Sequence, residues 1–442
     1  MSNPPSVLDV PAHDDPSLRA PLRFVSPLAR HRRLSHRARE AVGDVLAHGA
    51  VEIGFQPVVD LASRRIVGYE ALARGPVGTA LESPDALFAA ARAAGRLDEL
   101  DWLCQREALR GAIAVGLRSP LVLFLNVEAD TSGFLPLDLR GLYARATAQM
   151  IVAVEVTERA LTRRPAALLG RVADMRALGC TVALDDVGTA SDSLAMMAVL
   201  APDVVKLDLA HLSGTPEHEL AEVLDAVAVQ SERSGATILV ERIETVAEAE
   251  LAGALGASLA QGWLFGRREV LRDAPPPPAE RPVHATVRLD PRDTTPFALV
   301  SDGRAVRHAS RSLLTGLSHH LEEQARAMGR SAVLVGAFER EDLFDQHARS
   351  RYADLARDVA FCGAVGERMP LEPADGVRGG RLQAGDPLAR EWTVAVVSPH
   401  MAAALAAYDV GRPGHSSYDY VLTHDRDVSV AVVAALMARI SS

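Results

Sequence analysis

The sequence predicts an α/β protein in which a TIM-type (β/α)8 barrel is followed by a smaller α/β domain. Short apolar runs alternate with helix-like stretches between about residues 50 and 265, and most of these runs end on a polar side chain. A proline-rich segment then separates this part from a second α/β pattern. Such alternation is typical of parallel strands joined by crossover helices. An open doubly wound sheet is the structural alternative.

The apolar runs are the expected strands. They cover residues 51–59, 65–73, 121–127, 151–157, 180–187, 203–208, 236–242 and, more weakly, 257–263. Stretches such as "SPDALFAAARAAG" and "ALLGRVADMRALG" predict helices between them, and Gly179 is a typical stop signal for the second. Eight strands in about 215 residues suit a barrel.

Composition narrows the functional class. The 442 residues are 48% hydrophobic, which is enough for two or three domains with real cores. The formal net charge of -10 argues against a broad nucleic-acid interface, so no DNA binding is expected. The three cysteines lie far apart and form no CxxC motif, which favours a reducing, cytoplasmic setting. No apolar run approaches the ~20 residues of a membrane span, and the N-terminus lacks a secretion signal pattern.

Four regions follow from these patterns. Residues 1–40 are rich in Pro, Arg and His and are expected to be a disordered lead-in. The barrel domain is expected at 41–271. The segment "RDAPPPPAERPVHA", residues 272–285, predicts an extended polyproline linker. The second domain is expected at 286–442.

Polar side chains lie at the ends of consecutive expected strands of the barrel. They are Glu70 and Arg74, Asn126, Glu155 and Glu158, Asp185 and Asp186, Lys206 and Asp208, Glu241, and Gln261. A single such residue is ordinarily a helix cap or the start of a solvated loop. Because the carboxyl ends of barrel strands converge on one mouth, seven consecutive strand ends predict one polar cup.

The negative charges of such a cup need compensation. Its five carboxylates would repel one another, and this repulsion would raise their pKa values or attract cations. The five carboxylates belong to Glu70, Glu155, Asp185, Asp186 and Glu241. Carboxylate oxygens together with the Asn126 carbonyl suit Mg²⁺ or Mn²⁺. Five carboxylates are too many for one ion, so two ions are expected, which is the usual arrangement for attack on a phosphodiester.

Lys206 is the only lysine among 47 basic residues. Chance is one explanation. The chemical one is that a small site accepts a compact ammonium and rejects the broad, planar guanidinium of Arg. Lys206 can then orient or help deprotonate an attacking water, or neutralise charge on a phosphate, while Arg74 is shaped to grip a phosphate. A Schiff-base lysine is the alternative, but it leaves the carboxylates unexplained.

The motif "YEALAR", residues 69–74, resembles the signature of EAL domains, phosphodiesterases of the bacterial second messenger cyclic di-GMP. The resemblance continues over about residues 45–268, in the family's order, through "FQPVV", "LFLNV", "VEVTE", "LDDVGT", "VVKLD", "ERIET" and "QGWLFGR". It implies a modified TIM barrel whose first strand is antiparallel. It also implies two Mg²⁺ or Mn²⁺ ions, hydrolysis of cyclic di-GMP to linear pGpG, and possible homodimers.

The resemblance also implies a role for each matching residue. Metal binding falls to Glu70, Asn126, Glu155, Asp185, Asp186 and Glu241. The catalytic residues implied by the resemblance are Glu70, Glu241 and Lys206. Glu241 serves the second metal and the catalytic water, and Lys206 lies beside that water. Substrate-side positions are Gln56, Arg74, Asp208 and Gln261, and Glu158 braces the loop after the fifth strand.

This chain departs from the family pattern around the site. The loop "DDVGTASDSL" has Val187 in place of an aromatic residue and Ala190 in place of Gly. Arg242 follows Glu241 directly, and Gly75 stands where Trp is common. We expect an active enzyme; the alternative is a catalytically weak or inactive cyclic di-GMP receptor.

The second domain lacks a comparable cup of ligands. Strands and helices are expected to alternate through "PFALVS", "SRSLLTGLSHHLEEQARAMG", "AVLVGAF", "RYADLARDVAFCGAVG", "EWTVAVVS", "HMAAALAAYDVG" and "VSVAVVAALMARI". His319 and His320 are expected on an exposed helix face, and Trp392 in the core. The pattern resembles the DICT sensory domain, which implies a regulatory module with an unidentified signal and an unknown signalling partner.

Overall fold

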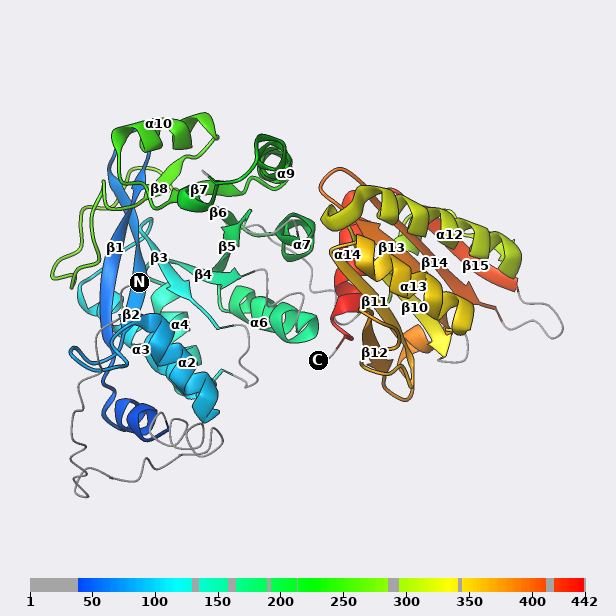
Figure 1. The fold of residues 1–442 in the computed structure, drawn as a ribbon, viewed down its shortest axis with the longest axis horizontal. Coiled ribbons are helices and arrows are strands. Elements are labelled where there is room, and N and C mark those ends of the chain that lie inside the picture. Colours follow the sequence, from blue (N-terminus) through cyan, green and yellow to red (C-terminus); the bar gives the residue numbers. More distant parts are fainter. Residues whose placement is uncertain are drawn as a thin grey trace, which may run out of the picture.

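The computed structural model describes residues 39–128, 135–157, 164–188, 192–212, 214–284, 294–340, 344–410 and 417–440. Almost all of the expected lead-in, residues 1–40, therefore lies outside the described residues, as does Glu158. Two bodies are visible along the chain: a barrel drawn in blue to green and a second domain drawn in yellow to red (Figure 1). Among the described residues, none of the helices combines the length and the hydropathy of a membrane-spanning segment.

The first body is a closed eight-stranded barrel, which excludes the open doubly wound sheet. Its strand β1 is antiparallel to β2 and β8, as the family resemblance implied, and the other neighbours are parallel. All eight expected strands are present, and the weakest run forms only a three-residue strand. The strands are β1 (Glu52–Asp60), β2 (Ile66–Arg74), β3 (Val122–Asn126), β4 (Ile151–Thr157), β5 (Thr181–Val187), β6 (Val204–Asp208), β7 (Thr237–Glu241) and β8 (Leu259–Gln261).

Helices surround the barrel. They are α2 (Pro84–Ala94), α3 (Leu97–Ala114), α4 (Leu137–Thr147), α6 (Pro165–Ala177), α7 (Asp192–Leu200), α8 (Leu209–Leu212), α9 (Glu217–Ser234) and α10 (Val246–Ala254). Local signals set their ends. The Ser83 side chain accepts a hydrogen bond from the backbone of Ala86 at the start of α2. Gly179, with φ +84°, follows the end of α6, so the predicted stop is confirmed.

The amino-terminal ends of the parallel strands are closed by an apolar layer. Phe124 and Leu239 are fully buried in it, and so is Val283 from the proline-rich segment. The Pro282 carbonyl accepts a hydrogen bond from the Thr237 hydroxyl at 3.2 Å. The end of this segment is thus packed against the barrel, where an extended linker was expected. The opposite, carboxyl-terminal end is left for polar side chains.

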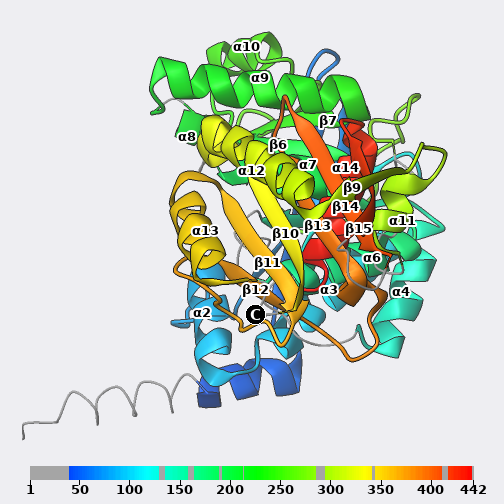
Figure 2. The same cartoon turned by 90° about the vertical axis from the view of Figure 1, so that its right-hand side faces the viewer.

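The second domain is a seven-stranded sheet of order β12-β11-β10-β13-β14-β15-β9, in which β10, β11 and β12 are parallel. Its strands are β9 (Arg307–Ser310), β10 (Val333–Arg340), β11 (Phe361–Glu367), β12 (Arg378–Leu382), β13 (Glu391–Val397), β14 (Ala402–Asp409) and β15 (Ser417–Thr423). Its helices are α11 (Pro296–Ser301), α12 (Arg311–Met328), α13 (Gln346–Asp358) and α14 (Arg426–Met437), with 3-10 turns η3 (Gly329–Ser331) and η5 (Pro387–Arg390). Helices α12 and α13 cover the face turned to the viewer in Figure 2, and α14 lies on the other side, toward the barrel (Figure 1).

The strict alternation expected in this domain is wrong at several points. Residues 296–301 form a helix, because Thr295 caps its first turn and Pro296 fits its first position. Residues 361–367, expected at the end of a helix, form β11. Residues 402–409 form β14 between two other strands, and residues 426–437 form a helix capped by Asp425.

Candidate active site at the barrel mouth

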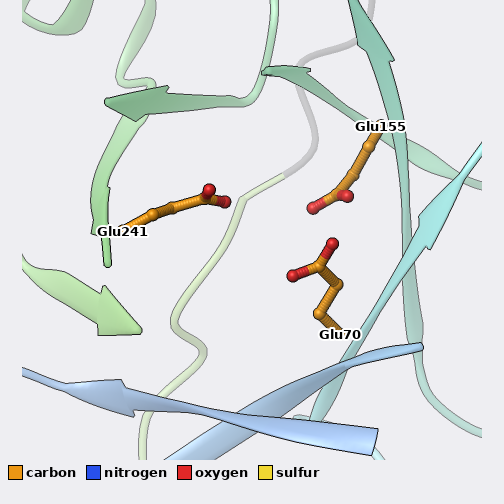
Figure 3. A group of neighbouring side chains, drawn as sticks. All are labelled: Glu70, Glu155 and Glu241. Atoms are coloured by element: carbon orange, nitrogen blue, oxygen red, sulfur yellow. The ribbon is translucent and has the colours of Figure 1, made fainter. Parts of the chain in front are cut away.

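Strand register places the expected site residues side by side at the carboxyl ends of the parallel strands. Asn126 is opposite Glu155, and Asp208 is opposite Glu241. The side chains of Glu70, Glu155 and Glu241 come from β2, β4 and β7 and point toward one another (Figure 3). Residues separated by more than 170 positions in the sequence therefore meet in one cup.

Lys206 lies at the centre of this cup, with its side chain only 1% exposed. Its Nζ is 2.5 Å from Glu155 Oε1, 2.5 Å from Glu241 Oε1, 3.3 Å from Asp185 Oδ1 and 3.8 Å from Glu70 Oε1. One ammonium thus faces four carboxylates, which is why a compact cation suits this position.

Two side-chain amides hold Glu70 in place. Asn126 Nδ2 donates to Glu70 Oε1 at 2.9 Å, and Gln261 Nε2 donates to Glu70 Oε2 at 2.6 Å. The backbone permits this arrangement only with glycine after Gln261, because a Cβ at Gly262 would lie 2.1 Å from the Ile243 carbonyl oxygen. Both amides thus donate to the carboxylate, which leaves their own oxygens for other partners.

Burial and like charges shift the pKa values of the cluster. Burial raises the pKa of Glu155 far above its usual range, and neighbouring Glu70 adds to this effect. Burial likewise raises the pKa of Glu241 to about 8, against the opposing effect of Lys206. Burial alone would lower the pKa of Lys206, but the surrounding carboxylates, Asp185 first, outweigh it and raise that pKa. A lysine that stays protonated is a poor amine nucleophile, which argues against the Schiff-base alternative.

The cluster fits a divalent cation. Glu70, Glu155 and Glu241 each offer one carboxylate oxygen, and these oxygens lie within 4.8 Å of one another. Glu155 Oε2 and Gln261 Oε1 are buried and have no hydrogen-bond partner among the residues that the structure describes. Buried oxygens with free lone pairs are costly unless a cation or donor reaches them. Carboxylate and amide oxygens are the donors that Mg²⁺ and Mn²⁺ prefer.

The two adjacent aspartates lie at different depths. Asp185 contacts Lys206, whereas Asp186 is exposed at the rim, in the left-handed region with φ +60°. The carboxyl of this exposed residue is still partly buried, and this raises the pKa of Asp186, as does neighbouring Asp185. The turn at Asp186 therefore splits the pair, with one carboxylate inside the cup and one at its edge.

Other expected site residues lie outside the cluster. Gln56 pairs with Glu70 across β1 and β2, and its Nε2 donates to the Gly266 carbonyl at 3.2 Å. Arg74 is exposed at the end of β2. Asp208 is buried and already engaged, because its Oδ1 accepts from the backbone of Ala210 at 2.9 Å, at the start of α8.

Arg242 has a role that the sequence did not reveal. Its Nε lies 3.0 Å from Asp208 Oδ2, and its side chain is 64% exposed. The bulky residue beside Glu241 therefore turns outward and holds Asp208 instead of filling the cup. Local packing also explains the glycine at position 75, because a Cβ on Gly75 would lie 2.1 Å from the Leu81 carbonyl oxygen. A larger residue at this position would require the Leu81 backbone to move.

Comparison with known families agrees with the barrel and its cup. Residues 37–268 match the model of the EAL domain. The chain belongs to the EAL-domain family. In this EAL-domain protein, residues 300–409 also match a second family model, the sensory domain in diguanylate cyclases and two-component systems, DICT. Both resemblances expected from the sequence are thereby confirmed.

Relatives of this EAL-domain protein include two from Pseudomonas aeruginosa. "Cyclic di-GMP phosphodiesterase NbdA" is 28% identical over 235 residues, which cover 52% of this chain and 30% of NbdA. "Cyclic di-GMP phosphodiesterase RocR" is 28% identical over 247 residues, which cover 51% of this chain and 60% of RocR. The chain thus spans less than two thirds of either relative. A solved structure of BlrP1 from Klebsiella pneumoniae, a complex with manganese and cyclic di-GMP, is 25% identical with a TM-score of 0.42, covering 50% of this chain and 56% of that one.

Proposed function

We propose that this protein hydrolyses one phosphodiester bond of cyclic di-GMP and releases linear pGpG, in a reaction that depends on divalent metal ions. The observation that carries the proposal is the cup in which four carboxylates surround the buried Lys206 at the carboxyl ends of the barrel strands. Membership of the EAL-domain family and the names of relatives such as NbdA and RocR support the substrate.

Two ions, Mg²⁺ or Mn²⁺, would be held by oxygens of Glu70, Asn126, Glu155, Asp185, Asp186 and Glu241. When bound, such ions polarise the phosphate and lower the pKa of an attacking water. The side chains of the cup are suited to this loading, because Glu70 is already oriented by Asn126 and Gln261.

The protein's own side chains would share the remaining tasks. Burial raises the pKa of Glu241 to about 8, so this carboxyl is mostly protonated near neutral pH while the cup holds no metal cations. Bound metal cations would favour its carboxylate form, which could then accept a proton from water. Lys206 keeps its charge, holds Glu241 and Asp185 in position, and offsets negative charge that develops on the phosphate. Arg74 is exposed at the end of β2 and is free to grip a phosphate oxygen. Gln56, in the middle of β1, and Gln261, at the end of the neighbouring β8, are suited to substrate contacts.

The test is direct. Purified full-length protein is incubated with cyclic di-GMP and Mn²⁺, and the products are separated by chromatography. The proposal predicts linear pGpG from the wild type and from a control variant, Glu52→Gln, which removes an exposed carboxylate outside the cup. It predicts almost none from Glu70→Ala. If the wild type gives no more product than Glu70→Ala, the enzyme proposal is wrong.

The alternative function is a cyclic di-GMP receptor that binds without cutting. One observation favours it: Asp208, a substrate-side residue by resemblance, is engaged by Arg242 and by the start of α8. The same incubation distinguishes the two functions, since a receptor would retain the intact dinucleotide. Saturable binding without linear product would establish the receptor.

We further propose that the second domain regulates the barrel through α7. This helix begins four residues after the Gly188 turn that follows Asp185 and Asp186, and its residues 194–200 are all buried. It packs against α14 and η3 of the second domain, and the apolar core runs continuously through this contact. Figure 1 shows α7 and α14 side by side. Because α7 is already covered, a homodimer would need another surface, and homodimerisation stays a prediction.

A charge reversal tests this coupling. His400 of the second domain lies 3.2 Å from Asp225 on α9. Asp225→Arg replaces the partner of His400 with a cation, so this contact between the domains is lost and turnover should change. Glu222→Arg makes the same charge change on the exposed part of α9 and should leave turnover as it is. Equal turnover in both variants would contradict regulation through this contact. The cytoplasmic location and the unknown signalling partner also remain predictions.

A further inference from the structure

The second domain contains a pocket of about 280 Å³ on the face of the sheet that points away from α14. Its lining residues come from β10 and β13, which form the floor, and from α12 and α13, which form the walls. Figure 2 shows these two helices in front of the sheet. The floor is largely apolar, with Ala337, Phe338, Trp392 and Val394. Trp392, which the sequence predicts in the core, packs against the core of this domain, but its ring is only half-buried and also lines the pocket floor.

Helix α12 presents an unusual face to this pocket. A helix that packs on a sheet normally turns an apolar stripe inward. Here the residues that line the pocket follow helical spacing and are polar: Arg311, Thr315, Ser318, His319 and Glu322. Two of them are almost fully buried, Ser318 at 3% and Glu322 at 2% exposure. Burying polar groups at these positions is costly unless they are hydrogen-bonded or paired.

The internal contacts orient the walls and leave cationic groups for a ligand. Trp392 Nε1 donates to Ser318 Oγ at 3.1 Å, which fixes the indole ring. Glu322 Oε2 is paired with Arg351 Nε at 2.6 Å, and Asp345 caps α13 by accepting from the Ala348 backbone at 2.8 Å. Both acids of the pocket are therefore already engaged.

Arg311 is different. Its guanidinium lies over the Trp392 ring, 5.5 Å from the centroid, and no carboxylate pairs with it among the residues that the structure describes. His319 and His347 stand at the same rim. The pocket therefore combines an aromatic floor with an uncompensated cation at its mouth, which is a suitable arrangement for a flat anion.

We propose that this pocket is a binding site for a small aromatic carboxylate, whose ring packs on Trp392 and Phe338 and whose anionic group pairs with Arg311. The volume, at the low end for ligand pockets, fits a single or fused ring better than a dinucleotide such as cyclic di-GMP. The signal of the second domain is then chemically distinct from the proposed substrate of the barrel. This assignment stands on the pocket alone and does not depend on catalysis.

The experiment titrates the full chain with three probes of increasing size, benzoate, phenylacetate and indole-3-acetate, and with the neutral amide of each, by calorimetry. We expect at least one carboxylate to bind saturably and its amide to bind about tenfold to a hundredfold more weakly. Arg311→Gln should remove this preference for the acid. Arg307→Gln, which changes an exposed arginine on β9 outside the pocket, should preserve it.

A second variant tests whether the acid binds in this pocket or elsewhere on the chain. Thr315→Phe places a ring in the pocket from a half-buried position, so it should abolish binding of acid and amide alike. The proposal is overturned if none of the three acids binds up to about 10 mM, since weaker binding would not be specific. It is equally overturned if binding persists unchanged in both Arg311→Gln and Thr315→Phe.

Discussion

Replacing Lys206 with Met tests the electrostatics of the cup most sharply. The substitution keeps the length of the side chain but removes the ammonium that faces Glu70, Glu155, Asp185 and Glu241. Among the described residues, no other Lys or Arg nitrogen lies within ion-pair distance of these carboxylates. The variant therefore leaves buried carboxylates without a counter-ion when divalent ions are chelated.

The expected penalty follows from burial. Removing one partner of a buried ion pair costs about 3–5 kcal/mol. With a urea slope of about 3 kcal/mol/M, the unfolding midpoint should fall by about 1 to 2 M. Protonation relieves the penalty, because the carboxyls without their counter-ion have pKa values raised above those of the unfolded chain. Such groups bind more protons when folded, so stability is lost as pH rises. The deficit should be larger near about pH 9 than near about pH 6.

The assay follows tryptophan fluorescence during urea unfolding in the presence of a chelator. In a Trp392→Phe background, the two remaining tryptophans, Trp102 and Trp263, both lie in the barrel domain and report its unfolding. The control is Arg242→Met, which removes a mostly exposed partner of Asp208 and should cost about 1 kcal/mol or less. If both variants unfold at the same urea midpoint at either pH, the carboxylates of the cup do not depend on Lys206 as their counter-ion.

Three further results are expected. Lys206→Arg keeps the charge but not the compact shape, so turnover should fall about a hundredfold while calorimetry shows cyclic di-GMP affinity within a few-fold of the wild type; full activity would contradict this. Asp185→Asn should weaken Mn²⁺ binding and turnover together, by about tenfold or more, and loss of turnover with unchanged Mn²⁺ affinity would refute the ligand role. Burial raises the pKa of Asp101 to about 7, so the folded chain binds this proton more tightly than the unfolded chain, and stability should fall as pH rises from about 4 to about 7. Asp101→Asn should flatten that part of the curve of thermal midpoint against pH, and an unchanged curve would exclude Asp101 as its source.

The barrel could be predicted because its signals are local and repeated. Strands buried on both faces read as continuous apolar runs, so runs such as 121–127 and 180–187 identify strands without knowledge of their neighbours. The cup could be predicted for the same reason. Once the strands are parallel, Glu155 and Lys206 must emerge at the same end of the barrel.

The second domain was predicted less well because tertiary context overrides local preference there. The alanine-rich residues 402–407 favour a helix by intrinsic propensity, yet they form β14, where small side chains are buried between β13 and β15. The contact between Arg242 and Asp208 depends on the left-handed backbone of Arg242, with φ +59°, directly after β7. The sequence pattern does not indicate this conformation. The pocket beneath α12 depends on the distance between α12 and α13 above the sheet. This distance cannot be predicted from the sequence pattern.

Calorimetry of metal binding tests the central claim most directly. Chelator-stripped protein is titrated with Mn²⁺ and with Mg²⁺, with and without cyclic di-GMP. Convergent carboxylates around Lys206 predict uptake of two ions per chain, and a loss of that uptake in Glu70→Ala. No uptake of either metal, even with the dinucleotide present, would contradict the account.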